Sequence, residues 1–529
     1  MNLKIVIVLL LAVNSLIQAG QPYWVFFDPD PLAPAVQLSE KTEQRLEIRG
    51  IAGHRGSQQI SMVHLASLRD AGFKIRHSSR FLNAVSIEVE NAVELEILKH
   101  MPFVKSTSPV ARHPERKLTE MDSNPQLQRI SRDNYGQSYT QNQMLNIPKI
   151  HNYGYDGSGV IIGVFDTGFY PVHPTFDQLN ILAQYDFVDH EPDPAGSGHE
   201  HGINTLSLLG GFSAGELIGS AYGASYLLAR TEDNDSETRA EEDNWVAALE
   251  WADSLGVDII SSSLNYFQQH DDPEENYPLS ALDGETTIIT RAANIAAERG
   301  ILVVNSAGNE GPSASSIWPP ADSRHVLSVG AINSQGQIAS FSGRGPTFDG
   351  RLKPSIVAMG QSVYMASGTS AFKLANGTSF STPLVAGLAA LLLQANPGLT
   401  PDSMISIFED HGSLGHFPNN NYGHGIPDIS SLFLDLKLRS SHNCLVYPNP
   451  ATNREINMVL RDAVADNIAV ARLFDIRGRE IAILPVTPKS TNITHLVLPE
   501  SLDLASQLII LSVESEGKIY SGKFVYIRS

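Results

Sequence analysis

The stretch that decides the fold reads VIIGVFDTG and occupies residues 160–168. Its first six residues are apolar or glycine with no polar alternation, which is typical of a parallel β-strand buried on both faces. Further strands are predicted at 257–261 and 301–304, with a helix at 286–299 between them. Alternating strands and helices predict an α/β fold with a doubly wound parallel sheet, in a domain that spans residues 139–440.

The composition limits what this chain can bind. Its 529 residues correspond to about three or four folding units at roughly 150 residues each. Lys and Arg total 37 against 57 Asp and Glu, and the resulting net charge of −20 argues against nucleic acid as a partner. With 42% hydrophobic and 18% charged residues the chain is globular and can bury a core. The single cysteine, Cys444, excludes an intrachain disulfide and a cysteine-based zinc site.

The N-terminus carries the pattern of an export signal. Lys4 precedes an apolar run over residues 5–13, and a polar region then leads to Ala19 and Gly20. The run is too short to span a bilayer and predicts a secretory signal peptide over residues 1–20. We therefore expect a secreted protein, extracellular or attached to the cell surface. Secretion without disulfides favours bacterial export over the eukaryotic route.

Two smaller regions flank the α/β domain. Residues 21–115 follow the order strand, helix, strand, strand, helix, strand, which predicts a ferredoxin-like α+β domain. Residues 116–138 are polar and form a linker or processing region. Residues 441–529 lack helical periodicity, and short strands such as 507–513 and 518–527 predict an all-β sandwich there.

Three polar motifs fall where an α/β sheet places its reactive groups. Asp166 ends a buried strand, at the sheet edge where such folds bind ligands. His201 stands in His-Glu-His-Gly (199–202), and Ser379 stands in Asn-Gly-Thr-Ser-Phe-Ser-Thr-Pro (376–383) before an apolar, hence buried, helix. A serine hydroxyl becomes a nucleophile when a base lies within hydrogen-bond reach and a carboxylate orients that base.

These motifs, together with Asn309 in Asn-Ser-Ala-Gly-Asn-Glu-Gly-Pro (305–312), resemble those of the subtilases, the subtilisin-like serine peptidases. The resemblance covers about residues 145–429. It implies a serine endopeptidase in which Ser379 attacks the scissile carbonyl and His201 moves the proton. Asp166 would fix the histidine tautomer. Asn309 and the Ser379 backbone N–H would bind the oxyanion.

The same resemblance implies that Ser263, Leu264 and Asn265 bind the substrate. The glycine that commonly follows Ser-Leu is Asn265 here, so the shape of the specificity pocket stays open. Ile203 replaces the usual threonine after His-Gly, and Gly343 stands where many members have serine. None of these departures removes a catalytic group. The chemistry requires no cofactor, and structural calcium is common among relatives, although this sequence identifies no ligands for it.

The flanking regions resemble known companions of subtilases. Residues 21–115, chiefly through Leu-Asn-Ala-Val-Ser-Ile at 82–87, resemble an inhibitor-type propeptide. This implies a zymogen whose own propeptide blocks the cleft. Residues 441–529 resemble the C-terminal sorting domains of the bacterial type IX secretion system, through Tyr-Pro-Asn-Pro at 447–450 and the segment 473–480. The implied partners are polypeptide substrates, the propeptide and the secretion machinery, and we expect a monomer.

Alternative interpretations of the motifs stay open. His199 competes with His201 as the base, although the glycine directly after His201 favours the latter. His-Glu-His could bind a metal, but residues two apart on a helix point in different directions. The acidic stretch 232–243 is either a solvated loop or a border of the cleft that favours basic substrates. The chain could also be a catalytically silent surface protein for binding or adhesion, or an amidase or esterase with the same triad.

Overall fold

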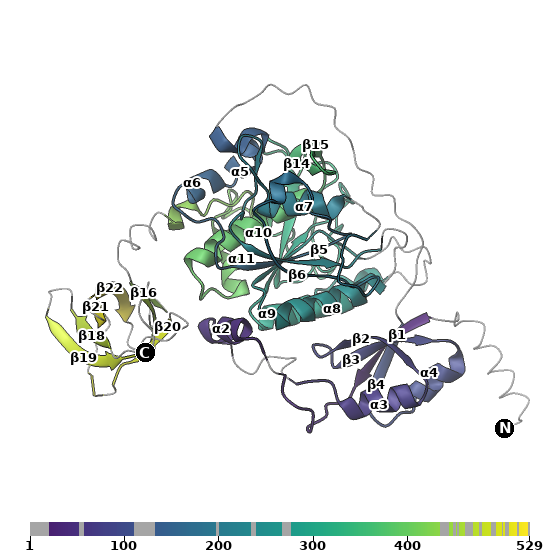
Figure 1. Cartoon of the computed structure of the whole chain (residues 1–529). Coiled ribbons are helices and arrows are strands. Elements are labelled where there is room, and N and C mark those ends of the chain that lie inside the picture. The colour runs from purple at the N-terminus through teal and green to yellow at the C-terminus, as the bar shows by residue number, and fades with distance from the viewer. Residues whose placement is uncertain are drawn as a thin grey trace, which may run out of the picture. The chain divides into compact units, whose positions relative to one another are not determined.

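Seven strands form the sheet at the centre of the largest domain in this computed structural model (Figure 1). Their order is β13-β12-β11-β10-β5-β9-β6, and each pairing is parallel, as the sequence predicts. Strand β5 is buried along its whole length, which explains its unbroken apolar pattern. The strands are β5 (Ile161–Asp166), β6 (Asn180–Asp186), β9 (Ser225–Arg230), β10 (Ile259–Ser262), β11 (Leu302–Ser306), β12 (Val326–Ile332) and β13 (Ile356–Met359).

The structure describes sixteen stretches of the chain. They are residues 21–36, 38–51, 58–109, 133–196, 200–233, 240–266, 277–433, 444–447, 451, 454–460, 469–475, 479–487, 493–499, 501–502, 507–515 and 518–526. The predicted signal peptide lies outside them, as do His199 and most of the predicted linker. The chain divides into two compact units, Met1–Ile429 and Ser430–Ser529.

Helices cover both faces of the parallel sheet. Helices α8 (Ala240–Ser254) and α9 (Ile288–Glu298) lie side by side on one face, and α10 (Thr378–Ala395) lies on the other (Figure 1). Helix α10 is long and apolar enough to cross a membrane, but its residues are buried in the core of this domain. Its close packing needs Gly387, since a Cβ there would lie 1.9 Å from the Ser220 hydroxyl.

Shorter elements complete this domain, which we call the central domain (described residues 133–429). Helix α7 precedes two small hairpins, β7-β8 and β14-β15. The elements are η1 (Asp133–Ser138), α5 (Tyr139–Gln143), α6 (Ile147–His151), η2 (Pro174–Phe176), α7 (His201–Gly210), β7 (Phe212–Ser213), β8 (Leu217–Ile218), η4 (Leu279–Ala281), β14 (Val363–Ser367), β15 (Ala371–Ala375) and α11 (Pro401–Asp410).

The N-terminal domain (described residues 21–109) is an antiparallel sheet of order β2-β3-β1-β4 with helices. One helix was expected between its first two strands, and the structure has two, since α2 precedes the expected α3. Polar composition hid α2, because its apolar face is narrow. The elements are β1 (Gln21–Phe27), α2 (Glu40–Ile48), α3 (Met62–Asp70), β2 (Lys74–Ser79), β3 (Ala84–Val89), α4 (Ala92–Lys99) and β4 (Val104–Pro109).

Strand β1 shows how this sheet uses both of its faces. Val25 and Phe27 pack into the core of the N-terminal domain itself. Their neighbours Trp24 and Phe26 point to the opposite face, because side chains alternate along a strand. There they join the hydrophobic cluster that contains Trp245 of α8. The two domains therefore share a buried apolar contact.

The second compact unit contains two antiparallel sheets, of order β16-β17-β20 and β19-β18-β21-β22. Alternate residues of β18 are buried, as expected for strands with one face on a core. Its buried apolar residues form one cluster of their own. The strands are β16 (Cys444–Tyr447), β17 (Glu455–Leu460), β18 (Ala469–Phe474), β19 (Glu480–Val486), β20 (Ile493–Val497), β21 (Gln507–Ser515) and β22 (Lys518–Tyr526).

Candidate active site

Asp166 is the last residue of β5 and lies at the carboxyl edge of the sheet. It is 0% exposed. Its Oδ1 lies 2.6 Å from His201 Nδ1, and its Oδ2 accepts a hydrogen bond from Thr205 Oγ1 at 2.9 Å. Burial alone raises the pKa of this carboxyl, but the charge of the His201 ring and these hydrogen bonds outweigh burial and hold the pKa below its ordinary value. Asp166 is therefore poised to stay ionised beside the imidazole.

His201 begins helix α7 and is 6% exposed. Close packing explains why a glycine follows His201. A Cβ at residue 202 would lie 2.1 Å from the carbonyl oxygen of Gly168, in the loop directly after Asp166. Gly202 therefore lets the first turn of α7 touch that loop, which brings the imidazole to the carboxylate. The neighbouring Glu200 accepts from Ser367 Oγ at 2.8 Å, toward the β14-β15 hairpin.

Ser379 is the second residue of α10 and is 7% exposed. The ring of the next residue, Phe380, lies 5.7 Å from the His201 ring, so the start of α10 adjoins the histidine. The first turn of a helix leaves its backbone N–H groups without helical partners, and the helix dipole favours negative charge there. The helix start that carries Ser379 thus lies beside His201 and in a positive field.

Asn309 follows β11 and faces the same helix start. Its Oδ1 accepts hydrogen bonds from the backbone N–H and from Oγ1 of Thr378, both at 2.9 Å. Because Thr378 holds the amide oxygen, the orientation of the Asn309 carboxamide is fixed, with its NH₂ group as the donor. A donor fixed in this way beside Ser379 suits an oxygen that gains negative charge.

The predicted substrate-binding residues follow β10 on the other side of Ser379. Ser263 Oγ donates to the main-chain oxygen of Ser379 at 2.9 Å. Leu264 is buried, and its carbonyl oxygen accepts from Asn305 Nδ2 at 2.8 Å. The Asn265 side chain reaches across to Ser306. The structure therefore brings all of the predicted site residues to one edge of the sheet.

Sequence reasoning missed two threonines that support the site. Thr205 donates to Asp166, and Thr378 holds the amide of Asn309. A signal for Thr205 was present, because it lies four residues after His201 and residues at that spacing share one face of a helix. Thr378 precedes Ser379, but no local pattern connects it with Asn309, 69 residues earlier.

Comparison with known proteins agrees with this geometry. The model of the subtilase family matches residues 157–425. The chain belongs to the subtilase family. Subtilisin BL of Lederbergia lenta is 35% identical over 282 residues, which cover 53% of this chain and 92% of that protein. M-protease of Shouchella clausii is 31% identical over 351 residues, or 64% and 81% of the two chains. Subtilisin E of Bacillus subtilis is 29% identical over 314 residues, or 58% and 74%.

Membership of this family makes the chain a serine-type, subtilisin-like peptidase. The subtilase reaction needs no cofactor. Many subtilases bind structural calcium. Among the described residues there is one cluster of three carboxylates, Asp186, Asp189 and Glu191, whose oxygens lie within 4.8 Å of one another. Arg230 Nη1 donates to Asp186 Oδ2 at 2.7 Å and also contacts Asp189. Because a guanidinium already supplies the positive charge, this arrangement does not fit a calcium ion.

The acidic stretch of this subtilase is not a solvated loop over its described second half. Glu241, Glu242 and Asp243 lie in the first turn of α8 and are 2%, 1% and 0% exposed. Acidic residues are stabilised at a helix N-terminus, which explains their place. Tyr277 donates to Glu242 at 3.0 Å. Residues 234–239 lie outside the described part of the chain.

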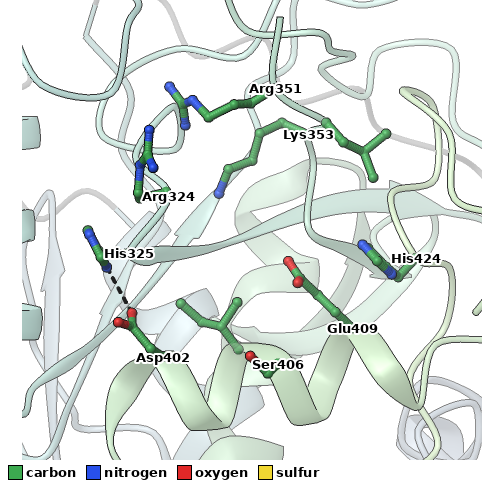
Figure 2. A pocket seen from close by; sticks show the side chains of 10 residues that line it. Arg324, His325, Arg351, Lys353, Asp402, Ser406, Glu409 and His424 are labelled. Atoms are coloured by element: carbon green, nitrogen blue, oxygen red, sulfur yellow. Dashed lines mark hydrogen bonds and ion pairs between the residues drawn. The ribbon is translucent and has the colours of Figure 1, made fainter.

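Figure 2 shows a charged cavity of this subtilase, of about 430 Å³. The cavity lies apart from the candidate active site. Val326, which begins β12, accepts a hydrogen bond from Lys353 Nζ at 2.8 Å, whereas Asp166 ends β5. The strands are parallel, so the cavity and the site lie at opposite edges of the sheet. Burial lowers the pKa of Lys353 to about 7. The lining residues are Arg324, His325, Arg351, Leu352, Lys353, Asp402, Ile405, Ser406, Glu409 and His424.

Proposed function

We propose that this subtilase is a secreted endopeptidase that hydrolyses peptide bonds with Asp166, His201 and Ser379 and binds the oxyanion with Asn309. The contact of 2.6 Å between Asp166 Oδ1 and His201 Nδ1 carries the proposal. It lies next to the helix start that holds Ser379. A carboxylate buried at this point has a clear use, because it stabilises the charged form of the histidine.

The reaction follows from this arrangement. Ser379 Oγ attacks the carbonyl carbon of the scissile bond, and its proton passes to Nε2 of His201. The carbonyl oxygen becomes an oxyanion, which accepts hydrogen bonds from the Asn309 amide and the Ser379 backbone N–H. The C–N bond then breaks, and His201 gives the proton to the leaving amine. Water repeats the sequence on the acyl-enzyme, which releases the acid and restores Ser379.

We further propose that the N-terminal domain is the propeptide of a zymogen. Its docking on α8 supports this role. Glu250 of α8 accepts hydrogen bonds from Ser79 Oγ at 2.5 Å and from the backbone N–H groups of Arg80 and Phe81 at 3.0 and 3.2 Å. With the shared apolar cluster around Trp245, this contact fixes the sheet of the N-terminal domain against the helix face.

Helix α2 supplies a second anchor for the N-terminal domain. Arg45 and Arg49 lie four residues apart on one helix face and are 3% and 7% exposed. Arg45 bonds with Asp253 and with the carbonyl oxygens of Val257 and Arg299. Arg49 donates to Asp258 Oδ1 at 2.9 Å and to the carbonyl oxygen of Gly300. Buried charges of this kind are stable only with their partners, so the anchor favours a tightly held propeptide.

Export completes the proposal. We propose that residues 1–20 are a signal peptide and that residues 441–529 sort the protein through type IX secretion. The support for the second assignment is the motif pattern of the segment and its all-β fold. A silent binding protein on the same fold is not favoured, since the relatives above are proteases.

The proposed function predicts self-processing that depends on one oxygen atom. The chain from residue 21 onward is produced as wild type and as Ser379→Ala, and its intact mass is followed over time. We expect the wild type alone to lose an N-terminal fragment of about the size of residues 21–135 and then to hydrolyse casein. Equal processing of both proteins, or no casein hydrolysis by a processed wild type, would contradict the proposal.

A further inference from the structure

We infer that Asn265 fills the space which would receive the acyl-side residue, the residue whose carbonyl is attacked, and that this subtilase therefore cleaves after small residues such as glycine, alanine and serine. The inference rests on the proposed function and names the substrate class of the same site. It starts from the two chain segments that flank Ser379.

Those segments continue two neighbouring parallel strands. Strands β10 and β11 pair with Ser262 opposite Asn305, and each then runs on beyond the sheet edge. The continuation of β10 touches Ser379 through Ser263, and that of β11 reaches Thr378 through Asn309. A carbonyl that lies on Ser379 with its oxygen toward Asn309 belongs to a residue seated between the segments. Its side chain must enter the gap between them.

Asn265 spans this gap, because it follows β10 and bonds to Ser306 at the end of β11. Its Nδ2 donates to the carbonyl oxygen of Ser306 at 2.9 Å and faces that of Trp318 at 3.4 Å. Its Oδ1 accepts from Ser306 Oγ at 2.8 Å. The donor and the acceptor of the carboxamide are both in use, so the side chain is fixed across the gap. A large side chain would have to displace it and leave Ser306 without these partners.

A second side chain crowds the same place. A Cβ built on Gly308 would lie 2.7 Å from Glu310 Oε2 and 3.9 Å from Asn265 Oδ1. Glu310 Oε2 also accepts the backbone N–H of Asn309 at 2.7 Å. The open face of Gly308 is thus covered by two polar groups, which leaves room for a small substrate side chain only.

Residues 306–308 form a wall of the gap that is packed from behind and cannot move outward to enlarge it. Behind it, a Cβ at Gly343 would lie 2.2 Å from the carbonyl oxygen of Ala307. The backbone N–H of Gly343 donates to the carbonyl oxygen of Gly308 at 2.8 Å. Glycine at 343, where many subtilases have serine, therefore packs this wall from the rear. Enlarging the gap therefore requires displacement of a side chain that enters it, such as Asn265.

The test is a series of internally quenched peptides that differ only at the acyl-side residue, with Gly, Ala, Leu, Phe or Lys. They are cleaved by the chain from residue 21 onward after it has lost its N-terminal fragment. We expect kcat/KM for Ala to exceed that for Phe by about 10²-fold. Asn265→Gly should raise kcat/KM for Phe by about 10- to 100-fold and so lower the Ala-to-Phe ratio. Asn265→Ala, which keeps the Cβ, should give an intermediate gain and serves if the glycine variant folds poorly. Asn421→Gly, at an exposed position, is the matched control and should leave the ratio unchanged.

The outcomes separate this inference from the proposed function. Turnover with Phe, Leu or Lys preferred by the wild type overturns the inference and leaves the peptidase assignment intact. So does an Ala-to-Phe ratio that neither Asn265 variant moves. No turnover at any residue, by a protein that has lost its N-terminal fragment, overturns both. Mass spectrometry of the products confirms that the same bond is cut throughout.

Discussion

Two carboxylates of this subtilase, Asp166 and Asp253, are both 0% exposed and both bonded to nitrogen-bearing side chains, yet those side chains differ in kind. Asp166 meets a histidine, His201. Asp253 meets Arg45, Arg80 and Arg299. At both sites burial raises the pKa of the carboxyl, and the charged partners more than offset burial, so the pKa is lowered.

The difference lies in what the partner can release. Histidine gains and loses a proton near neutral pH, so the Asp166 pair can support proton transfer. Arginine stays charged at any pH a protein tolerates. The ion pairs of Asp253 can therefore hold the two domains together but cannot transfer a proton. In the proposed mechanism Asp166 serves the chemistry, whereas Asp253 joins the N-terminal domain to α8 and α9.

The largest effect is expected at the nucleophile. Ser379→Ala should lower kcat by about 10⁶-fold, because no other group can form the acyl-enzyme. The measurement is hydrolysis of a peptide substrate by protein freed of its N-terminal domain by a second protease. Ser381→Ala is the matched control, since Ser381 lies in the same helix and donates to the Thr378 carbonyl oxygen. A comparable loss in the control would show that the helix start, not the Ser379 hydroxyl, matters.

The two carboxylates themselves give the next largest effect. Asp166→Asn should lower kcat by about 10⁴-fold, because the amide stabilises the wrong histidine tautomer. Asp253→Asn should leave kcat of the processed enzyme unchanged, because that carboxylate contacts no reacting group. Both values are measured per active site, with the site concentration obtained by titration. Equal losses of kcat in the two variants would show that Asp166 and Asp253 do not differ in function.

Loss of the α2 anchor should weaken binding without changing catalysis. Arg45→Ala with Arg49→Ala removes two buried charge pairs, each worth about 3–5 kcal/mol when one partner is removed. In a Ser379→Ala chain with a protease site inserted between residues 109 and 133, the cut N-terminal fragment should dissociate at least about 10²-fold more readily. Co-elution in gel filtration at several concentrations measures this. Arg69→Ala, at an exposed position of α3, should behave as the parent does.

The smallest effect concerns pH at the same interface. Burial, aided by the charges of Arg76 and His190, lowers the pKa of His77 from 6.5 to about 4. The contribution of His77 to retention of the N-terminal fragment is therefore full above pH 6.5 and is lost as the pH falls toward 4. Burial raises the pKa of Asp243 from 3.8 to about 7, so its contribution is full below pH 3.8 and is lost as the pH rises toward 7. Between pH 4 and 6.5 the contribution of His77 to fragment retention rises with pH and that of Asp243 falls, so the two changes oppose each other.

Replacing one of the two residues should reveal the pH dependence of fragment retention that the other contributes. In His77→Gln, retention of the cut fragment should fall as the pH rises from 4 to 7, by up to about tenfold per pH unit. In Asp243→Asn, retention should rise with pH from 4 to 6.5. The same gel-filtration assay in buffers of equal ionic strength measures both. Identical pH profiles in the parent and both variants would contradict these assignments.

Local patterns in the sequence predicted the parts of the molecule that depend on neighbours in the chain. The apolar run before Asp166 predicted a buried strand, and the motif around Ser379 predicted a buried helix, and both are found. The burial of Arg45 and Arg49 could not be predicted, because their partners lie more than 200 residues away. The role of Asn265 was left open for the same reason, since Ser306 is 41 residues distant.

The most direct test of the account is covalent labelling with a fluorophosphonate, which reacts with a serine only when a base activates it. The processed chain is labelled, digested and mapped by mass spectrometry, with His201→Ala and Asp166→Asn run in parallel. We expect one label per chain, on the peptide that contains Ser379, with labelling lost in His201→Ala and strongly slowed in Asp166→Asn. A label on another serine, or equal labelling of Ser379 in all three proteins, would contradict it.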